Sequence, residues 1–324
     1  MHRVPNRFRR WLRLMLVVVG VALAVVELRG HLPDAASAWA VLRQASPIWL
    51  AAALVLQVLS MAAFAEQQRH LLAGFGVRMS ALVSLAVTYA HTAMSSALPA
   101  GSVVSAGYTF QQFCVRGASK SVAAAVMVLS GVASTAGLLV LYGGDALSWL
   151  SLGARMLAGV LAGALVLLVG WAYSRRPQRA GGPSTALPSS RAGRVVRAVR
   201  ETTALARTVP PRRWLGVLAL AIVNWLTDLA CLLAALHAVD LTVPAHAVVA
   251  GYLAAQLVRQ IPITPGGVGV IEASLILALT TAGAPLAPAT AAVLIYRFLS
   301  CWMVLPVGLV CWTTQRNPRV QLAA

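Results

Sequence analysis

Long apolar runs alternate with short polar or Pro- and Gly-rich stretches along almost the whole chain. A helix needs roughly 20 consecutive apolar residues to cross about 30 Å of hydrocarbon. Runs of this kind predict membrane spans at 11–28, 47–65, 121–142, 153–173, 213–236 and 287–312. Two further apolar regions, 79–113 and 246–282, are interrupted by Pro and Gly. The pattern predicts an all-α polytopic membrane helix bundle in which these two regions are not simple spans.

Composition supports a single membrane domain over residues 1–324. Hydrophobic residues make up 59% of the chain, charged residues only 10%, and the mean hydropathy is +0.79. These values lie outside the range of soluble globular domains. The run 11–28 also resembles a signal peptide, because several Arg precede it. We favour a retained span, since Glu27 and Arg29 follow directly and the remaining runs need a membrane in any case.

Basic residues gather at the ends of the predicted spans. The net charge is +18, which would suggest nucleic acid as a partner for a soluble protein. Here, however, five Arg lie within the first 13 residues and ten more lie within 175–213. The positive-inside rule then places both termini and the linker 174–212 in the cytoplasm of a cell-membrane protein. No nucleic-acid partner is expected.

The Arg-rich linker 174–212 allows two interpretations. Arginines recur every three residues at Arg191, Arg194, Arg197 and Arg200, with valines between them. A helix with this spacing would be basic and amphipathic, able to lie on an anionic leaflet. A solvated loop that only fixes the topology would have the same composition.

Motifs for catalysis are missing from the sequence. The four cysteines have no metal-binding spacing, and the six histidines do not pair at helical spacing. No Walker loop, nucleophile elbow or zinc-protease motif occurs. We therefore expect no catalytic residues, no metal site and no cofactor.

An internal repeat relates the two halves of the chain. The segments 96–108 and 262–274 align, and so do 123–130 and 289–296. At the same offset of 166, the matched residues are Pro99 and Pro265, Gly101 and Gly267, and Gly117 and Gly283. The repeats are predicted at 47–142 and 213–312.

The number of predicted spans between the two repeats gives them opposite orientations in the membrane. With the N-terminus inside, region 79–113 must enter and leave from the cytoplasm, and region 246–282 from outside. Residues 102–113 would form a helix of about 18 Å, which is too short to cross. We therefore predict two opposed re-entrant helical hairpins whose tips meet near the midplane. Irregular backbone at that depth usually lines a cavity, and broken helices in inverted repeats typically form a transport site.

Polar residues near the hairpin tips are the candidate site. The helix that begins near Gly269 would direct its positive end towards an anionic group. Arg259 and Arg297 lie at membrane depth, where charges are costly and usually functional. The residues selected from position and chemistry are Arg259, Pro265, Gly266, Gly267, Gly269, Glu272 and Arg297, with Pro99, Gly101, Ser102, Asp228 and Asn224 as secondary candidates.

Two interpretations of these charges remain open. The arginines could coordinate a phosphate through their planar forks, oriented by the acids. Alternatively, they could form buried ion pairs that hold the helices together. Glu272 is the natural partner for one arginine, and Asp228 and Asn224 are other candidates.

The run ITPGGVGVIEASLILALTTAGAP, followed by AAVLIYRFLS, resembles the signature of the lysylphosphatidylglycerol synthase transmembrane-region family. The resemblance covers essentially the whole chain. It implies a multi-pass bundle that binds or moves a lipid headgroup, and in well-understood members an aminoacylated phosphatidylglycerol. It also adds Tyr296 to the candidate site.

The chain departs from the family pattern in two respects. The first repeat reads AGSVVSAGYTFQQF and lacks the family's Gly-Glu pair and following Arg, which leaves the headgroup open. The sequence ends at Ala324 without the aminoacyltransferase domain, so synthase activity is not expected. A partner enzyme would then supply the lipid.

The expected function is binding and transbilayer movement of an anionic or phosphate-bearing membrane lipid, in a flippase-like manner. One alternative is a secondary transporter of a small water-soluble anion at the same site. Another is a non-transporting subunit that scaffolds a lipid-linked glycosyltransferase.

Overall fold

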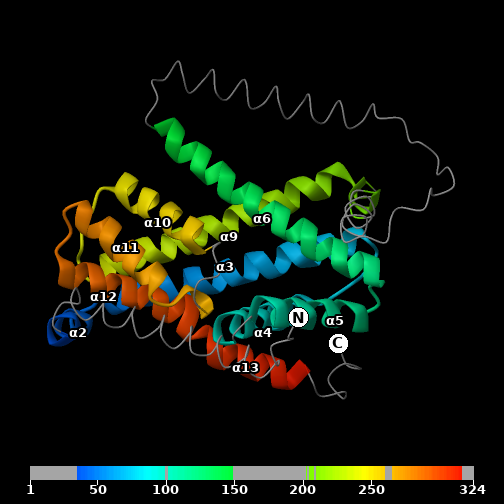
Figure 1. The fold of residues 1–324 in the computed structure, drawn as a ribbon, viewed down its shortest axis with the longest axis horizontal. Helices are drawn as coiled ribbons and strands as arrows, with labels where there is room; N and C mark the ends of the chain where they lie inside the picture. The colour runs from blue at the N-terminus through cyan, green and yellow to red at the C-terminus, as the bar shows by residue number, and fades with distance from the viewer. Residues whose placement is uncertain are drawn as a thin grey trace, which may run out of the picture.

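The computed structural model describes residues 35–98, 101–148, 202, 204–207, 209–259 and 265–315, which form helices and turns but no strand. In chain order the principal elements are α2 Ala35–Arg43, α3 Pro47–Gly74, α4 Ala81–Ala97, α5 Gly101–Val115, α6 Lys120–Ser148, α9 Pro211–Ala238, α10 Ala245–Arg259, the 3-10 turn η1 Pro265–Gly267, α11 Val270–Thr281, α12 Leu286–Arg297, the π turn η2 Phe298–Trp302 and α13 Val304–Gln315 (Figure 1). The predicted spans 11–28 and 153–173 lie outside the described residues.

Four of the described segments are long and apolar enough to cross a membrane. They are Pro47–Gly74, Lys120–Gly144, Pro211–Ala238 and Leu286–Gln315. Each contains one of the apolar runs predicted from the sequence. The prediction of an all-α membrane helix bundle is confirmed.

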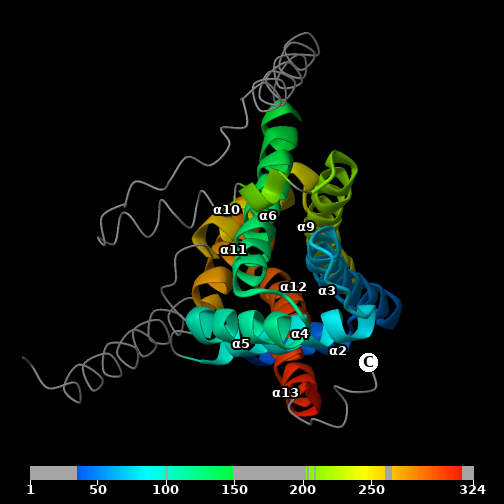
Figure 2. The ribbon, with the colours of Figure 1, turned by 90° about the vertical axis from the view of Figure 1, so that its right-hand side faces the viewer.

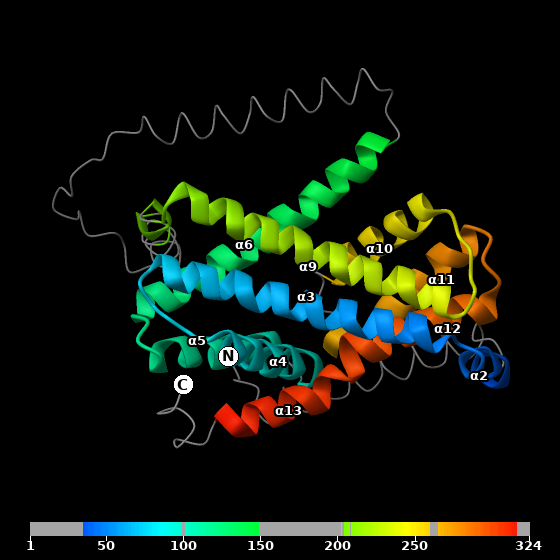
Figure 3. The ribbon, with the colours of Figure 1, turned by 180° about the vertical axis from the view of Figure 1, so that it is seen from behind.

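Helices α3 and α9 lie next to each other (Figure 2), pack along their lengths and run antiparallel (Figure 3). The backbone N–H of Ser46, just before α3, donates to the carbonyl oxygen of Ala238 at the end of α9, at 2.7 Å. At the opposite end, Gly74 lies against the side chain of Val209. Each helix has 28 residues, or about 42 Å at 1.5 Å per residue. The pair therefore forms the long axis of the bundle.

The remaining helices include two short antiparallel pairs, α4–α5 and α10–α11. The first pair begins and ends at one end of the bundle, and the second begins and ends at the opposite end (Figure 3). α5 has 15 residues and α11 has 12. These lengths correspond to about 22 Å and about 18 Å, which are short of a 30 Å hydrocarbon core. The geometry agrees with the predicted hairpins, whose placement in a membrane stays a prediction.

The ends of α5 and α11 recur at the offset of 166 found in the sequence. α5 and α11 both end before a glycine with φ of 94°, Gly117 and Gly283. In both turns the residue after the glycine donates its backbone N–H to the carbonyl oxygen five residues earlier, as in a Schellman cap. These hydrogen bonds join Ala118 to Phe113 at 3.1 Å and Ala284 to Leu279 at 3.0 Å. α3 and α9 both begin with proline, at a slightly different offset of 164, and proline suits the first helical position because that N–H has no helical partner. The repeat itself stays a prediction.

One element breaks the match between the two halves. α6 is a continuous helix of 29 residues, whereas its counterpart is divided into α12 and α13 by η2. The N–H of Met303 donates to the carbonyl oxygen of Phe298, five residues earlier, at 2.8 Å. Such π turns within helices occur frequently at functional sites. This turn directly follows Arg297.

Candidate functional site

The turn η1 places the second hairpin tip against the first. A Cβ atom at Gly266 would lie 3.2 Å from the Cβ and carbonyl oxygen of Ser96, at the end of α4. Gly266 also has φ of 64°, a left-handed conformation that L side chains adopt at a cost. Glycine at this position thus allows both the turn and the close approach. The contact brings the ends of α4 and α10–α11 together.

An ion pair fixes this turn from within. Arg297 is 3% exposed, and its Nε donates to Oε1 of Glu272 at 2.6 Å. Arg297 Nη2 donates to the carbonyl oxygen of Gly266 at 3.0 Å. The other carboxylate oxygen, Oε2, accepts the N–H of Gly269 at 2.7 Å. The predicted pairing of Glu272 with an arginine is confirmed, and the partner is Arg297.

This network also occupies the positive end of α11. Glu272 is the third residue of the helix, and it accepts a hydrogen bond from the N-cap N–H. A carboxylate in this position stabilises the helix N-terminus. The anion expected at this end is therefore supplied by the protein itself. Of the two interpretations of Arg297 and Glu272, the described contacts match the buried ion pair.

Asp228 lies in a second polar cluster, apart from the arginines. Its Oδ2 accepts hydrogen bonds from the hydroxyls of Tyr252, at 2.7 Å, and Tyr296, at 2.9 Å. The amide nitrogen of Gln256 approaches the same oxygen at 3.4 Å. Asp228 was an alternative ion-pair partner for the arginines, but its described partners are neutral. The cluster joins α9, α10 and α12 in the interior.

Arg259 is at the last position of α10 and is exposed. It follows Tyr252 and Gln256 by seven and three residues, so all three share one face of the helix. Its charge acts electrostatically on the hydroxyls of Tyr252 and Tyr296. Within the described residues it has no hydrogen-bond partner. Of the two predicted cations, Arg259 is thus the one whose guanidinium can reach a ligand.

The secondary candidates have separate locations. The side-chain oxygen of Asn224 accepts the Ser60 hydroxyl at 2.9 Å, which ties α9 to the middle of α3. Gly101 is buried at the start of α5, where a Cβ would lie 2.4 Å from the carbonyl oxygen of Met94. Ser102 follows it and is exposed. Pro99 lies outside the described residues.

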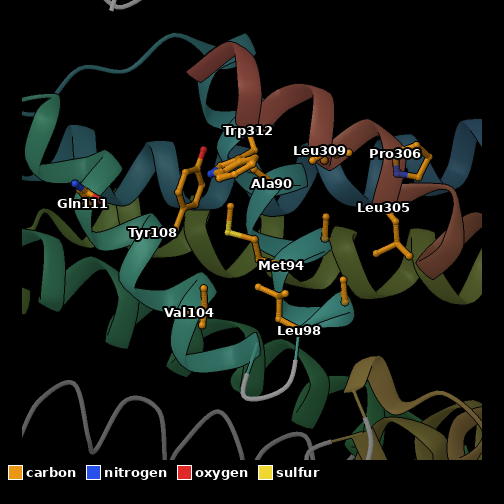
Figure 4. A pocket seen from close by; sticks show the side chains of 13 residues that line it. Ala90, Met94, Leu98, Val104, Tyr108, Gln111, Leu305, Pro306, Leu309 and Trp312 are labelled. Carbon is orange, nitrogen blue, oxygen red and sulfur yellow. The ribbon is translucent and has the colours of Figure 1, made fainter. Parts of the chain in front are cut away.

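An apolar cavity of about 630 Å³ lies beside the first hairpin, between α4, α5 and α13. Tyr108 and Trp312 lie together at one end of it, and Leu305 and Pro306 lie at the other (Figure 4). It is lined by Ala90, Ala93, Met94, Ala97, Leu98, Val104, Tyr108, Gln111, Leu305, Pro306, Gly308, Leu309 and Trp312. Leu98, Val104 and Leu309 are 40%, 47% and 57% exposed. The cavity therefore opens at the outer surface of the bundle.

Two members of the polar cluster and the cavity were not predicted from the sequence. Tyr252 and Gln256 could have been predicted from the sequence. They are four residues apart and are followed by Arg259, which is the pattern of a polar stripe on a largely apolar helix. The cavity has no comparable signal, since its lining is ordinary apolar sequence from distant segments. In the described part of the chain, no group of three or more His, Cys, Asp or Glu could hold a metal ion.

Comparison with known proteins places these features in a family. The family model described as lysylphosphatidylglycerol synthase TM region matches residues 10–308. The match includes both hairpins, the ion pair and the polar cluster. No curated protein matches the chain.

Proposed function

The chain belongs to the lysylphosphatidylglycerol synthase TM-region family, and from that premise we propose that it binds an anionic or phosphate-bearing lipid and moves it between leaflets. The headgroup lies near the hairpin tips, and the tails remain in the apolar cavity or the surrounding lipid. The protein acts as a carrier and not as an enzyme, and an enzyme in the same membrane supplies the lipid.

The cavity is the observation that favours a lipid over a water-soluble anion. Its lining is almost entirely apolar, and exposed side chains at its rim would face acyl chains in a membrane. Its volume lies within the usual range of about 300–1,000 Å³ for ligand sites. A small hydrated anion gains no binding free energy from contact with such an apolar surface. A lipid tail, by contrast, is already surrounded by hydrocarbon in the membrane and meets an equally apolar surface in the cavity.

Arg259 supplies the charge for the headgroup. An exposed guanidinium beside a hairpin tip can contact a phosphate through two parallel hydrogen bonds. The buried pair Glu272–Arg297 keeps the turn at Gly266 in place. In this proposal Arg297 positions the turn and Arg259 binds the headgroup. The sequence alone gives no reason to assign the two arginines different roles.

Movement between leaflets follows from the opposed hairpins. The recurring helix ends and the antiparallel α3–α9 pair support two inverted repeats, 47–142 and 213–312. Rocking one hairpin against the other opens the site alternately to each leaflet. Both termini and the linker 174–212 lie in the cytoplasm, as the distribution of arginines favours.

Filling the cavity is expected to stop lipid movement without unfolding the protein. Met94→Trp places a large ring in the cavity, whereas Val132→Trp adds the same ring to an exposed position on α6. We expect Met94→Trp to lose most of the translocation and Val132→Trp to keep it. The measurement is dithionite quenching of fluorescent phosphatidylglycerol in proteoliposomes, with fluorescent phosphatidylcholine as the neutral comparison.

The same assay separates the alternatives. Quenching beyond the outer leaflet with wild type, selective for phosphatidylglycerol, would support the proposal. Quenching limited to the outer leaflet for every lipid would instead favour an anion carrier or a scaffold. Full activity of Met94→Trp would place the tail outside this cavity.

The inverted arrangement makes a separate prediction for labelling. In a background without native cysteines, Ser80→Cys and Ser119→Cys lie at the two ends of the first hairpin, and Thr242→Cys and Thr281→Cys at those of the second. All four positions are exposed. We expect a membrane-impermeant maleimide to label the first two only from the cytoplasmic side, and the other two only from outside. Labelling of all four from one side would contradict the inversion.

A further inference from the structure

Asp228 is a carboxylate deep in a predicted span with no described cation to neutralise it. It lies ten residues before the end of α9, or about 15 Å along the helix, and is 6% exposed. Ionisable groups at this depth are costly and usually mark ion or proton pathways. Glu272, the other buried acid near the site, is paired with Arg297. Asp228 needs a different explanation.

The surroundings of Asp228 are polar but uncharged. Two tyrosine hydroxyls and the Gln256 amide donate to its Oδ2. α3 has no ionisable residue from 47 to 65, and α6 has none from 121 to 141. The ionisable groups that face Asp228 are Tyr252 and the more distant, exposed Arg259 on α10, Tyr296 on α12 and Cys231 on α9. None of these forms an ion pair with it.

The Gln256 amide gives an independent indication of a ligand. Gln256 is 3% exposed, and its Oε1 is buried without a hydrogen-bond partner among the described residues while its nitrogen faces Asp228. A buried unpaired acceptor costs about 1–3 kcal/mol. If the amide rotates by half a turn, its oxygen faces Asp228 and can accept an O–H from a protonated carboxyl. The site can therefore hold Asp228 with or without a proton.

We propose that Asp228 is a proton-binding site that couples lipid movement to the transmembrane proton gradient. The carboxylate takes up one proton and becomes a carboxylic acid, whose O–H donates to Gln256 Oε1. A proton fits better than Na⁺, because three donors already direct their hydrogens at Oδ2. Tyr252 and Gln256 lie on α10, so the charge of Asp228 is linked to the position of the second hairpin. The coupling rests on the proposed function, whereas the proton site does not.

The proton site can be tested without transport. Infrared difference spectra of the protein in membranes, recorded against pH, should contain a carbonyl band from a protonated carboxyl. We expect the band in wild type and in Glu66→Gln, and its complete loss in Asp228→Asn. Tyr252→Phe removes one hydrogen-bond donor from the carboxyl, so the carbonyl band should move to a different frequency. A band that survives Asp228→Asn, or that Tyr252→Phe leaves unmoved, would overturn the assignment.

The coupling is tested in the dithionite assay with imposed gradients. We expect a pH gradient to change the wild-type rate of lipid movement, and Asp228→Asn to move lipid without a pH response. Lipid movement by wild type that ignores pH, or that follows Na⁺ instead, would overturn the coupling while leaving the proposed function intact. Titration of the band without any lipid movement would support the proton site and contradict the proposed function.

Discussion

Glu272→Ala is expected to destabilise the protein by about 3–5 kcal/mol, the usual cost of removing one partner from a buried ion pair. The substitution leaves Arg297, a residue that is 3% exposed, with no described carboxylate to neutralise it. It also removes the acceptor for the Gly269 N–H at the start of α11. Both losses affect the turn that touches Ser96. Thermal unfolding in detergent, followed by fluorescence-detected size exclusion, measures the effect.

Glu66→Ala is the matched control. Glu66 pairs with Arg69 at 2.5 Å, but the two side chains are 26% and 37% exposed. Exposed pairs of this kind usually contribute about 0.2–1 kcal/mol. We therefore expect a small change for Glu66→Ala and a large one for Glu272→Ala. Equal effects of the two substitutions would show that the buried pair has no special role.

The double substitution Glu272→Gln with Arg297→Met separates a structural pair from a binding pair. Replacing both members by uncharged side chains often restores much of the stability lost by removing one. We expect the double variant to be more stable than Glu272→Ala. If the pair only positions the turn, the double variant also recovers part of its lipid movement. If Arg297 contacts the headgroup, stability recovers and lipid movement does not.

The helix layout could be predicted because it depends on local sequence. Apolar runs set the spans, and Pro and Gly set the turns. Helix α11 begins at Val270, beside the predicted start at Gly269. The repeat offset of 166 found from Gly117 and Gly283 reappears as two helix caps with the same φ. These features follow from hydropathy and backbone conformation, which neighbouring residues determine.

The partners of each polar side chain could not be predicted in the same way. The sequence places Arg259, Glu272, Asp228 and Arg297 at similar depth, but the rotation of each helix about its axis decides which of them meet. That rotation depends on packing between distant segments, as where Gly308 of α13 lies against α4. The π turn after Arg297 changes this rotation again. The sequence predicts that Glu272 pairs with an arginine, but the choice of Arg297 over Arg259, and the contacts of Asp228 with two tyrosines, emerge only in three dimensions.

Arg259→Ala is expected to lower binding and movement of an anionic lipid by roughly 10- to 100-fold while leaving the fold intact. Hydrogen bonds to charged groups contribute about 1.5–3 kcal/mol, and each 1.4 kcal/mol is a factor of ten. Arg259 is exposed at the end of α10, so its removal leaves no buried group unpaired within the described residues. Initial quenching rates for phosphatidylglycerol, together with thermal midpoints, provide the measurement.

Two further variants test whether Arg259 acts through its shape as well as its charge. Arg259→Lys keeps the positive charge but lacks the planar fork, so we expect an intermediate rate. Arg78→Ala removes an exposed arginine from the loop before α4, far along the chain from the tips, and should leave the rate unchanged. Loss of activity in Arg78→Ala equal to that in Arg259→Ala would indicate a general effect of surface charge. Full activity of Arg259→Ala would show that the headgroup does not bind at the end of α10. The apolar cavity would then be the remaining proposed contact for the lipid.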